Sequence, residues 1–237
     1  MSCCLMTMID DATNTRLARF FEQETTAAAM SVFSLWIRSY GIPQALYCDK
    51  KNAFVLAREP TDEELLAGVT EPKSHFGRAC EKLGVQVLAA NSPQAKGRVE
   101  RNHGLDQDRL VKELRLAGIS TIAQANQFLE ETYLPKMNLK FSRPPLQPED
   151  AHAPMGTANL KEIFCFEHDR KISNDYVVRF EKRLFQILKT NKALPRPKDK
   201  VLVRILLDGS LSIIWKGIKL LVKELTNAQG QKVREVA

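Results

Sequence analysis

A chain of 237 residues, 44% of them hydrophobic, is long enough to bury one good core and leave room for a small second domain. Its formal net charge of +7 and its sequence pI near 9.2 favour a polyanionic partner. Five cysteines without a CxxC pair, four scattered histidines and the lack of an apolar run of about 18 residues argue against a disulfide framework, a zinc finger and a membrane span. With no signal-peptide pattern, we expect a soluble intracellular protein.

The first part of the chain alternates strand and helix patterns. In chain order it predicts a strand (4–9), a turn (10–14), a strand (15–22), a helix (25–40), a strand (43–48), a helix (75–83), a strand (85–88) and two helices (93–116 and 121–134). Trp36 lies in the apolar stripe of its helix, which indicates a core residue. The strand at 43–48 follows a helix, so we expect a crossover and parallel pairing.

After a proline-rich stretch the pattern changes to short strands. The predicted strands are 171–172, 176–180, 184–188, 200–205 and 211–215. Asp208-Gly209 is the strongest hairpin signal in the chain. Short strands in this number suggest a small SH3-like barrel, and its many lysines and arginines make it basic. We therefore predict a core domain (1–141), a linker (142–160) and a basic C-terminal β-domain (161–237).

Two carboxylates stand out in the first part. The helix at 93–116 opens with Ser92 as N-cap and Pro93 as first residue, and Lys96 and Glu100 follow four residues apart on one face. A lone carboxylate among so many cations suggests a metal ligand that works beside a polyanion. About 50 residues upstream, Asp49 ends a short apolar strand.

These residues resemble a known family. Asp49, Phe54 and the run at 92–101 look like the catalytic core of DDE transposases and retroviral-type integrases. The stretch at 9–13 resembles the second-strand region of insertion-sequence transposases, and residues 194–211 resemble their C-terminal barrel.

The resemblance implies an α/β chain with an RNase H-like integrase core, followed by the SH3-like barrel. In this family three carboxylates hold two Mg²⁺ or Mn²⁺ ions for DNA strand cleavage and transfer by phosphoryl transfer. By the motif match Asp49 is the second of these carboxylates and Glu100 the third, and both are predicted catalytic residues and metal ligands.

The family's first aspartate lies on a strand that precedes the one predicted here at 4–9. Asp10 and Asp11 are tempting substitutes, but we interpret them as turn residues. We therefore expect an N-terminally truncated member that lacks the central first strand, binds metal weakly and is inactive in DNA cleavage. The alternatives are a non-catalytic DNA-binding protein that regulates or inhibits transposition by a full-length relative, or a decayed reading frame.

The resemblance also implies a DNA-binding surface. Lys96, Arg98 and Arg101 are predicted to contact phosphates, the alternative being a solvated helix face. Lys200 and Arg204 are the predicted DNA-binding residues of the barrel. The implied partners are transposon ends and target DNA, with a homo-multimer or co-assembly with a full-length transposase, and a cytoplasmic location on the nucleoid when DNA is bound.

Overall fold

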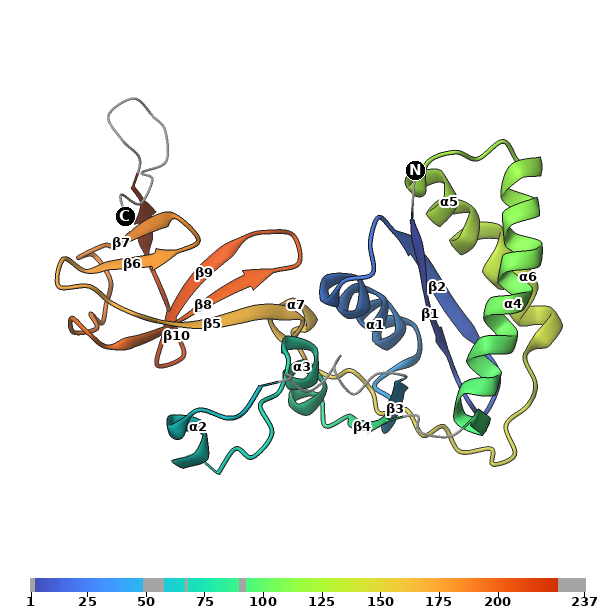
Figure 1. Cartoon of the computed structure of the whole chain (residues 1–237), viewed down its shortest axis with the longest axis horizontal. Helices are drawn as coiled ribbons and strands as arrows, with labels where there is room; N and C mark the ends of the chain where they lie inside the picture. Colours follow the sequence, from blue (N-terminus) through green and yellow to red (C-terminus); the bar gives the residue numbers. More distant parts are fainter. Residues whose placement is uncertain (1–2, 49–57, 67, 90–92, 226–237) are drawn as a thin grey trace. The chain divides into compact units, whose positions relative to one another are not determined.

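The computed structural model describes residues 3–48, 58–66, 68–89 and 93–225, with 63, 89, 93–103 and 105 described by their backbone alone. The chain divides into two compact units, Met1–Phe164 and Cys165–Ala237 (Figure 1). The first unit contains β1 (Cys4–Ile9), β2 (Arg16–Phe21), α1 (Thr26–Tyr40), β3 (Ala45–Cys48), α2 (Asp62–Leu66), α3 (His75–Lys82), β4 (Gln86–Ala89), α4 (Pro93–Leu116), α5 (Ile122–Phe128), the π-helix η2 (Leu129–Tyr133), α6 (Leu134–Phe141) and α7 (Leu160–Ile163). The second contains β5 (Cys165–Lys171), β6 (Val177–Phe180), β7 (Arg183–Ile187), β8 (Lys200–Leu206), β9 (Leu211–Trp215), β10 (Ile218–Leu220) and β11 (Val222–Glu224).

A hairpin of β1 and β2 lies at the centre of the first unit. The strands pair antiparallel from Cys4↔Phe21 to Ile9↔Arg16. In the turn between them, Asp10 accepts hydrogen bonds from the backbone N–H of Thr13 at 2.8 Å and from the Thr13 hydroxyl at 2.5 Å. The interpretation of Asp10 as a turn residue is thus confirmed, because its carboxylate is used to close the turn.

The two faces of the hairpin pack against different helices. Met8 and Leu17 contact the apolar cluster built around α1. Leu5 and Phe20, whose side chains point to the opposite face, contact a second cluster formed by α4, η2 and α6. Figure 1 shows α1 on one side of the hairpin and α4, α5 and α6 on the other.

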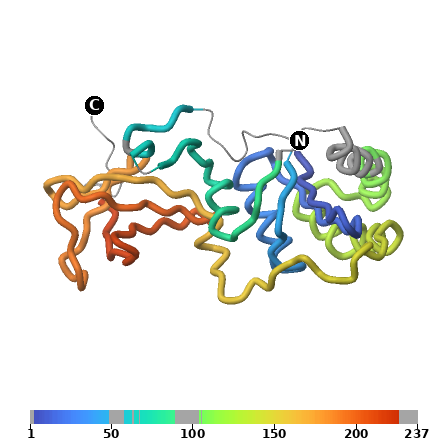
Figure 2. The backbone as a smooth tube through the Cα atoms, turned by 90° about the horizontal axis from the view of Figure 1, so that it is seen from below, coloured from blue at the N-terminus to red at the C-terminus, as the bar shows by residue number. Residues whose placement is uncertain are grey.

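Helix α1 supplies more buried residues to the first core than any other element. Thr25 caps it, since its side chain accepts a hydrogen bond from the N–H of Ala28. Trp36 is only 3% exposed, which confirms its prediction as a core residue. Gly41 ends the helix at φ +96°, and a Cβ there would lie 2.8 Å from the carbonyl oxygen of Ala153. The segment after α6 returns to make this contact, and its path is visible in yellow in Figure 2.

The predicted parallel pairing of β3 is confirmed, although its partner is the strand that follows it and not one that precedes α1. β3 and β4 pair in parallel from Ala45↔Gln86 to Cys48↔Ala89, with α3 in the connection. Leu46 and Val87 pack against the same cluster as α1, so both two-stranded sheets of this unit share one core.

Helix α4 has the bounds that the sequence predicts, Pro93–Leu116. The prediction that the next helix ends near Leu134 is wrong, since α5, η2 and α6 continue to Phe141. Pro135 does not stop the helix because it occupies the first turn of α6, where a proline removes no N–H that the helix needs.

The second unit is built of two small antiparallel sheets, ordered β10-β9-β8-β5 and β11-β7-β6. Asp208-Gly209 forms the turn between β8 and β9, as predicted, with Gly209 at φ +81°. The sequence did not predict β10, β11 or the first six residues of β5. The chain is therefore a mixed α/β protein with several small sheets. None of the helices in the described part of the chain is long and apolar enough to cross a membrane.

Candidate functional site

In the sequence, one predicted catalytic acid directly follows β3, and the other belongs to the helix that comes after β4. β3 ends at Cys48, and Asp49, which follows it directly, lies outside the described residues. β4 ends at Ala89, and α4 begins at Pro93. Because Cys48 and Ala89 are opposite each other in a parallel register, the chain leaves both strands at the same edge of the sheet.

Glu100 lies in the second or third turn of α4, about 10 Å along the helix axis from Pro93. Its side chain is not among those described, so its distance from Asp49 stays a prediction. The same holds for the side chains of Lys96, Arg98 and Arg101, which the backbone places on the first turns of α4. In the described part of the chain no group of three His, Cys, Asp or Glu side chains forms a metal site.

A buried ion pair anchors α4 to the hairpin. Asp106 of α4 accepts a hydrogen bond from Arg16 Nη1 of β2 at 3.0 Å and another from the Tyr133 hydroxyl at 2.8 Å. All three residues are at most 4% exposed. Burial raises the pKa of Tyr133 above its usual value, and the hydrogen bond to Asp106 raises it further. We call Arg16, Asp106 and Tyr133 the Arg16 cluster.

Sequence reasoning missed the Arg16 cluster. An arginine at the start of a strand and an aspartate in a charged helix are typical of exposed positions, since both residue types are rarely buried. A weak signal was present: Arg16 and Ala18 alternate with Leu17 and so share one face of β2.

Two asparagines cover the outer edge of β2. Asn138 of α6 accepts from the backbone N–H of Arg16 at 3.0 Å and donates to its carbonyl at 2.9 Å. Asn126 of α5 binds the backbone of Phe20 in the same way, at 2.7 and 3.0 Å. Each amide takes the place of a neighbouring strand residue, so the edge is closed to further pairing.

The predicted DNA-binding residues of the second unit differ in their surroundings. Lys200 is exposed at the start of β8 and lies opposite Lys171 of β5. Arg204 is paired with Glu167, with Arg204 Nη2 3.1 Å from Glu167 Oε1, and the two side chains are only 16% and 9% exposed. Because Lys200 is exposed and Arg204 is largely buried beside Glu167, the charged group of Lys200 is the more accessible of the two to a polyanion.

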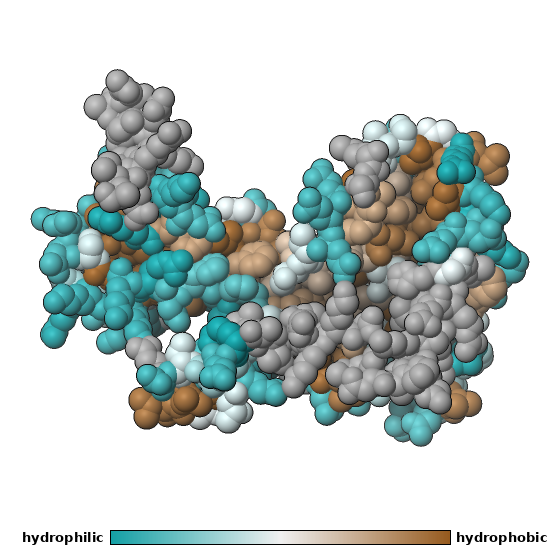
Figure 3. Space-filling model, viewed as in Figure 1, coloured by the Kyte–Doolittle hydropathy of each residue, from teal (hydrophilic) through white to brown (hydrophobic). Residues whose placement is uncertain are grey.

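The second unit carries an excess of positive charge on its surface. Between residues 165 and 225, lysines and arginines outnumber aspartates and glutamates by about two to one. The exposed basic residues are Lys171, Arg179, Lys182, Lys189, Lys192, Arg196, Lys198, Lys200, Lys216, Lys219 and Lys223. On the face drawn in Figure 3, the surface of this unit is largely hydrophilic. Such a surface attracts a polyanion without requiring any base sequence.

Comparison with known proteins identifies transposases as relatives. No protein-family model matches the chain. It is 33% identical to the putative transposase y4bF of Sinorhizobium fredii over 218 residues, which are 91% of this chain and 46% of that protein. It is 30% identical to the transposase for insertion sequence IS1202 of Streptococcus pneumoniae over 205 residues, 86% of this chain and 43% of that protein. The chain thus spans less than half the length of these curated relatives.

A chain in the cryo-EM structure of the simian T-cell lymphotropic virus intasome with PP2A regulatory subunit B56 gamma aligns with 94% of this chain and 73% of its own. The sequence identity is 18% and the TM-score 0.43, too low to define a common fold. The sequence relatives alone confirm the resemblance inferred from the motifs: over about nine tenths of its length, this chain is similar to transposases.

Proposed function

We propose that residues 1–237 form part of an insertion-sequence transposase and contribute Asp49 and Glu100 to a DDE-type site for DNA strand cleavage and transfer. The observation that carries this proposal is the parallel register of β3 and β4, which brings the chain leading to each acid to one edge of the sheet. Similarity to transposases over 91% of the chain supports it independently. In this proposal the first unit is an RNase H-like core and the second an SH3-like barrel.

The metal that suits this pair is Mg²⁺ or Mn²⁺, because carboxylate oxygens are the hard ligands that these ions prefer. When bound, such ions supply activation of the attacking water or 3′-hydroxyl and stabilisation of the leaving oxygen. Asp49 and Glu100 would hold the metal and so position the scissile phosphate against it. Asp10 is an unsuitable third ligand, because its carboxylate already accepts two hydrogen bonds within the hairpin turn.

Two carboxylates leave part of the metal's coordination to water and substrate, so residues 1–237 by themselves are expected to bind metal weakly and to be inactive in DNA cleavage. The third carboxylate of an active site would come from polypeptide outside these residues. Nicking of DNA by residues 1–237 in Mg²⁺, abolished by Glu100→Gln, would contradict this expectation.

The DNA surface of the proposed protein has two parts. One is the start of α4, with Lys96, Arg98 and Arg101 as phosphate contacts. The other is the basic second unit, where Lys200 is exposed. Binding through these charges is expected to weaken steeply as salt concentration rises, because condensed counterions are released from DNA.

A second candidate function is non-catalytic. The positive charge gathers on a unit with its own apolar core, which favours a DNA-binding protein that inhibits a full-length transposase by co-assembly or by covering its DNA. Inhibition of transposition in a mixed assay, unchanged by Glu100→Gln, would favour this candidate.

The metal site is tested by titrating residues 1–237 with Mn²⁺. Electron paramagnetic resonance of the free ion measures how much is bound. Weak saturable binding is expected, and Asp49→Asn or Glu100→Gln should each abolish it. Asp108→Asn is the matched control, since Asp108 is an exposed acid of the same helix that pairs with Lys112. Equal binding by all four proteins would overturn the proposed metal site.

A further inference from the structure

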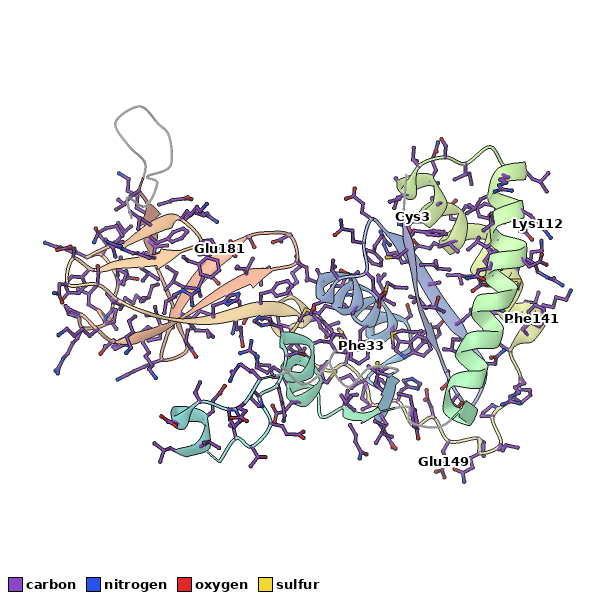
Figure 4. The ribbon with its side chains drawn as sticks, in the orientation of Figure 1. Cys3, Phe33, Lys112, Phe141, Glu149 and Glu181 are labelled. Carbon is purple, nitrogen blue, oxygen red and sulfur yellow. The ribbon has the colours of Figure 1, made fainter. Side chains whose placement is uncertain are left out.

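Helix α4 is attached to the hairpin by two kinds of contact. Leu110 and the partly buried Leu114 pack in the apolar cluster with Leu5 and Phe20. Asp106, one turn before Leu110, makes the buried ion pair with Arg16. Figure 4 shows the opposite, outer side of α4, where Lys112 points away from the hairpin.

The Arg16 cluster is a poor means of stabilising the fold. Arg16 Nε and Nη2 are buried and have no hydrogen-bond partner among the described residues. A buried ion pair loses its hydration, and apolar residues of similar volume often stabilise a protein as well or better. What a buried pair contributes more reliably is a single register between two elements, since a displaced helix would leave both charges unpaired.

Arg16 is also held unusually firmly. Asn138 fixes its backbone from α6, and the ring of Phe141 lies 5.8 Å from its guanidinium carbon. The π-helix η2 contributes the third member of the cluster: the N–H of Leu134 bonds to the carbonyl of Leu129, and Tyr133 inside this turn reaches Asp106. Arg16 is therefore a rigid reference point to which α4 is tied through Asp106.

Apolar contacts alone would define less sharply the height of α4, by which we mean its position along its own axis relative to the hairpin. Leu110 and Leu114 are spaced one turn apart, so a slide by one turn puts one of them in the place of the other and keeps part of their contacts. Such a slide moves every residue by about 5.4 Å along the axis and brings Lys96 or Gly104 to the height of Glu100.

We propose that Arg16, Asp106 and Tyr133 are positioning residues that fix the height and rotation of α4 on the hairpin, and thereby the height of Glu100 for its proposed pairing with Asp49. Glu100 lies six residues before Asp106 on the same helix, about 9 Å along its axis. This inference rests on the proposed function, which gives Glu100 its partner.

The test is a cross-linking series in the full 237-residue chain, with Cys3, Cys4 and Cys48 replaced by alanine. The buried thiols of Cys80 and Cys165 remain. Cysteine is placed at position 49 together with position 96, 100 or 104, and a short bifunctional thiol reagent measures which pair reacts. The series is repeated with the apolar triple replacement Arg16→Met, Asp106→Leu and Tyr133→Phe, with Tyr133→Phe alone, and with the control Asn126→Ala.

With the Arg16 cluster intact, the 49/100 pair should react about tenfold faster than 49/96 and 49/104, since reaction requires close approach. In the triple replacement the three rates should come within about threefold of one another, while the melting temperature stays near that of the parent. Tyr133→Phe should shift the rates in the same direction. Asn126→Ala removes two bonds to β2 from α5 but none from α4, so it should lower stability and leave the preference for 49/100 unchanged.

Two results would count against different claims. If 49/100 does not react preferentially with the cluster intact, the proposed pairing of Asp49 and Glu100 is wrong. If 49/100 is preferred and stays so in the triple replacement and in Tyr133→Phe, the positioning role is wrong and the proposed function stands. Should the triple replacement fail to fold, Tyr133→Phe decides, because it removes one oxygen atom and little volume.

Discussion

The two units differ in what they bury. In the first, the described core includes Arg16, Asp106 and Ser74, whereas the buried cluster of the second is apolar throughout. In the second unit, the ion pair of Arg183 with Glu224 keeps about a quarter to a third of its side-chain surface exposed, and that of Arg204 with Glu167 keeps 16% and 9%. The comparison teaches that one unit has an apolar buried core, while the other buries charged groups that define where a helix lies.

The largest effect is expected from truncating the apolar core of the second unit. Phe185 is 3% exposed and packs with Val178, Val203 and Ile213. Phe185→Ala should lower the free energy of unfolding of this unit by about 4 kcal/mol, through lost burial and the cavity left behind. Each unit contains one tryptophan, so urea unfolding of Trp36→Phe and Trp215→Phe variants reports on the two units separately. An equal loss in the first unit's transition would show that the two units unfold together and not separately.

Breaking the buried ion pair should have the next largest effect. Arg16→Met leaves Asp106 charged and buried without its partner, which should cost about 3 kcal/mol in the free energy of unfolding. The double replacement Arg16→Met with Asp106→Leu should recover most of that loss, because no buried charge is then left. Thermal and urea unfolding, monitored by the fluorescence of Trp36, measure the stability of the single and of the double variant. A double variant as unstable as the single one would mean that the pair is a genuine source of stability.

A smaller, pH-dependent effect is expected from Tyr133. Burial raises its pKa in the folded state, and the hydrogen bond to Asp106 adds to the shift. At a pH above about 10 the unfolded chain therefore ionises Tyr133 while the folded chain keeps its proton. The stability contributed by the hydroxyl should thus be constant below about pH 10 and fall as pH rises above it.

Tyr133→Phe should destabilise the first unit by about 1 kcal/mol at pH 7, with a difference from the parent that shrinks as pH rises above about 10. Unfolding of both proteins at pH 7 and over the alkaline range, at fixed salt, measures that difference. The pairing of Tyr133 with Asp106 would be refuted by a difference that grows with pH.

The smallest effect is expected at the partly exposed pair Arg183–Glu224. The two side chains make two hydrogen bonds, at 2.9 and 2.8 Å, and the bond to Glu224 raises the pKa of Arg183. Glu224→Gln should nevertheless change the stability of the second unit by only about 0.2–1 kcal/mol, and less at high salt, because solvent screens the pair. If Glu224→Gln lowered the free energy of unfolding about as much as Arg16→Met does, the ion pairs of the two units would not differ in their effect on stability.

Local sequence signals predicted most of the helices and strands. The bounds of α4, the hairpin of β1 and β2 and the Asp208-Gly209 turn follow from patterns within a few residues, and the parallel pairing of β3 follows from the alternation of strands and helices, which did not identify β4 as its partner. The same signals misjudged Pro135, since a proline that ends most helices is tolerated where a new helical turn begins. They also missed β10 and β11, which have three residues each and too short a pattern to recognise.

For the candidate site, the sequence by itself determined the likeness to transposases and led to the prediction of Asp49 and Glu100 as its acids, because both stand in short motifs. Only the tertiary structure decided how α4 is held. Arg16 and Asp106 are 90 residues apart, Phe20 and Asn126 are 106 apart, and Arg16 and Asn138 are 122 apart. A buried arginine or an asparagine bound to a strand edge looks like a surface residue until its partner is known. Local propensity reports only on neighbours in the chain, whereas these contacts form only when the hairpin and the helices pack together.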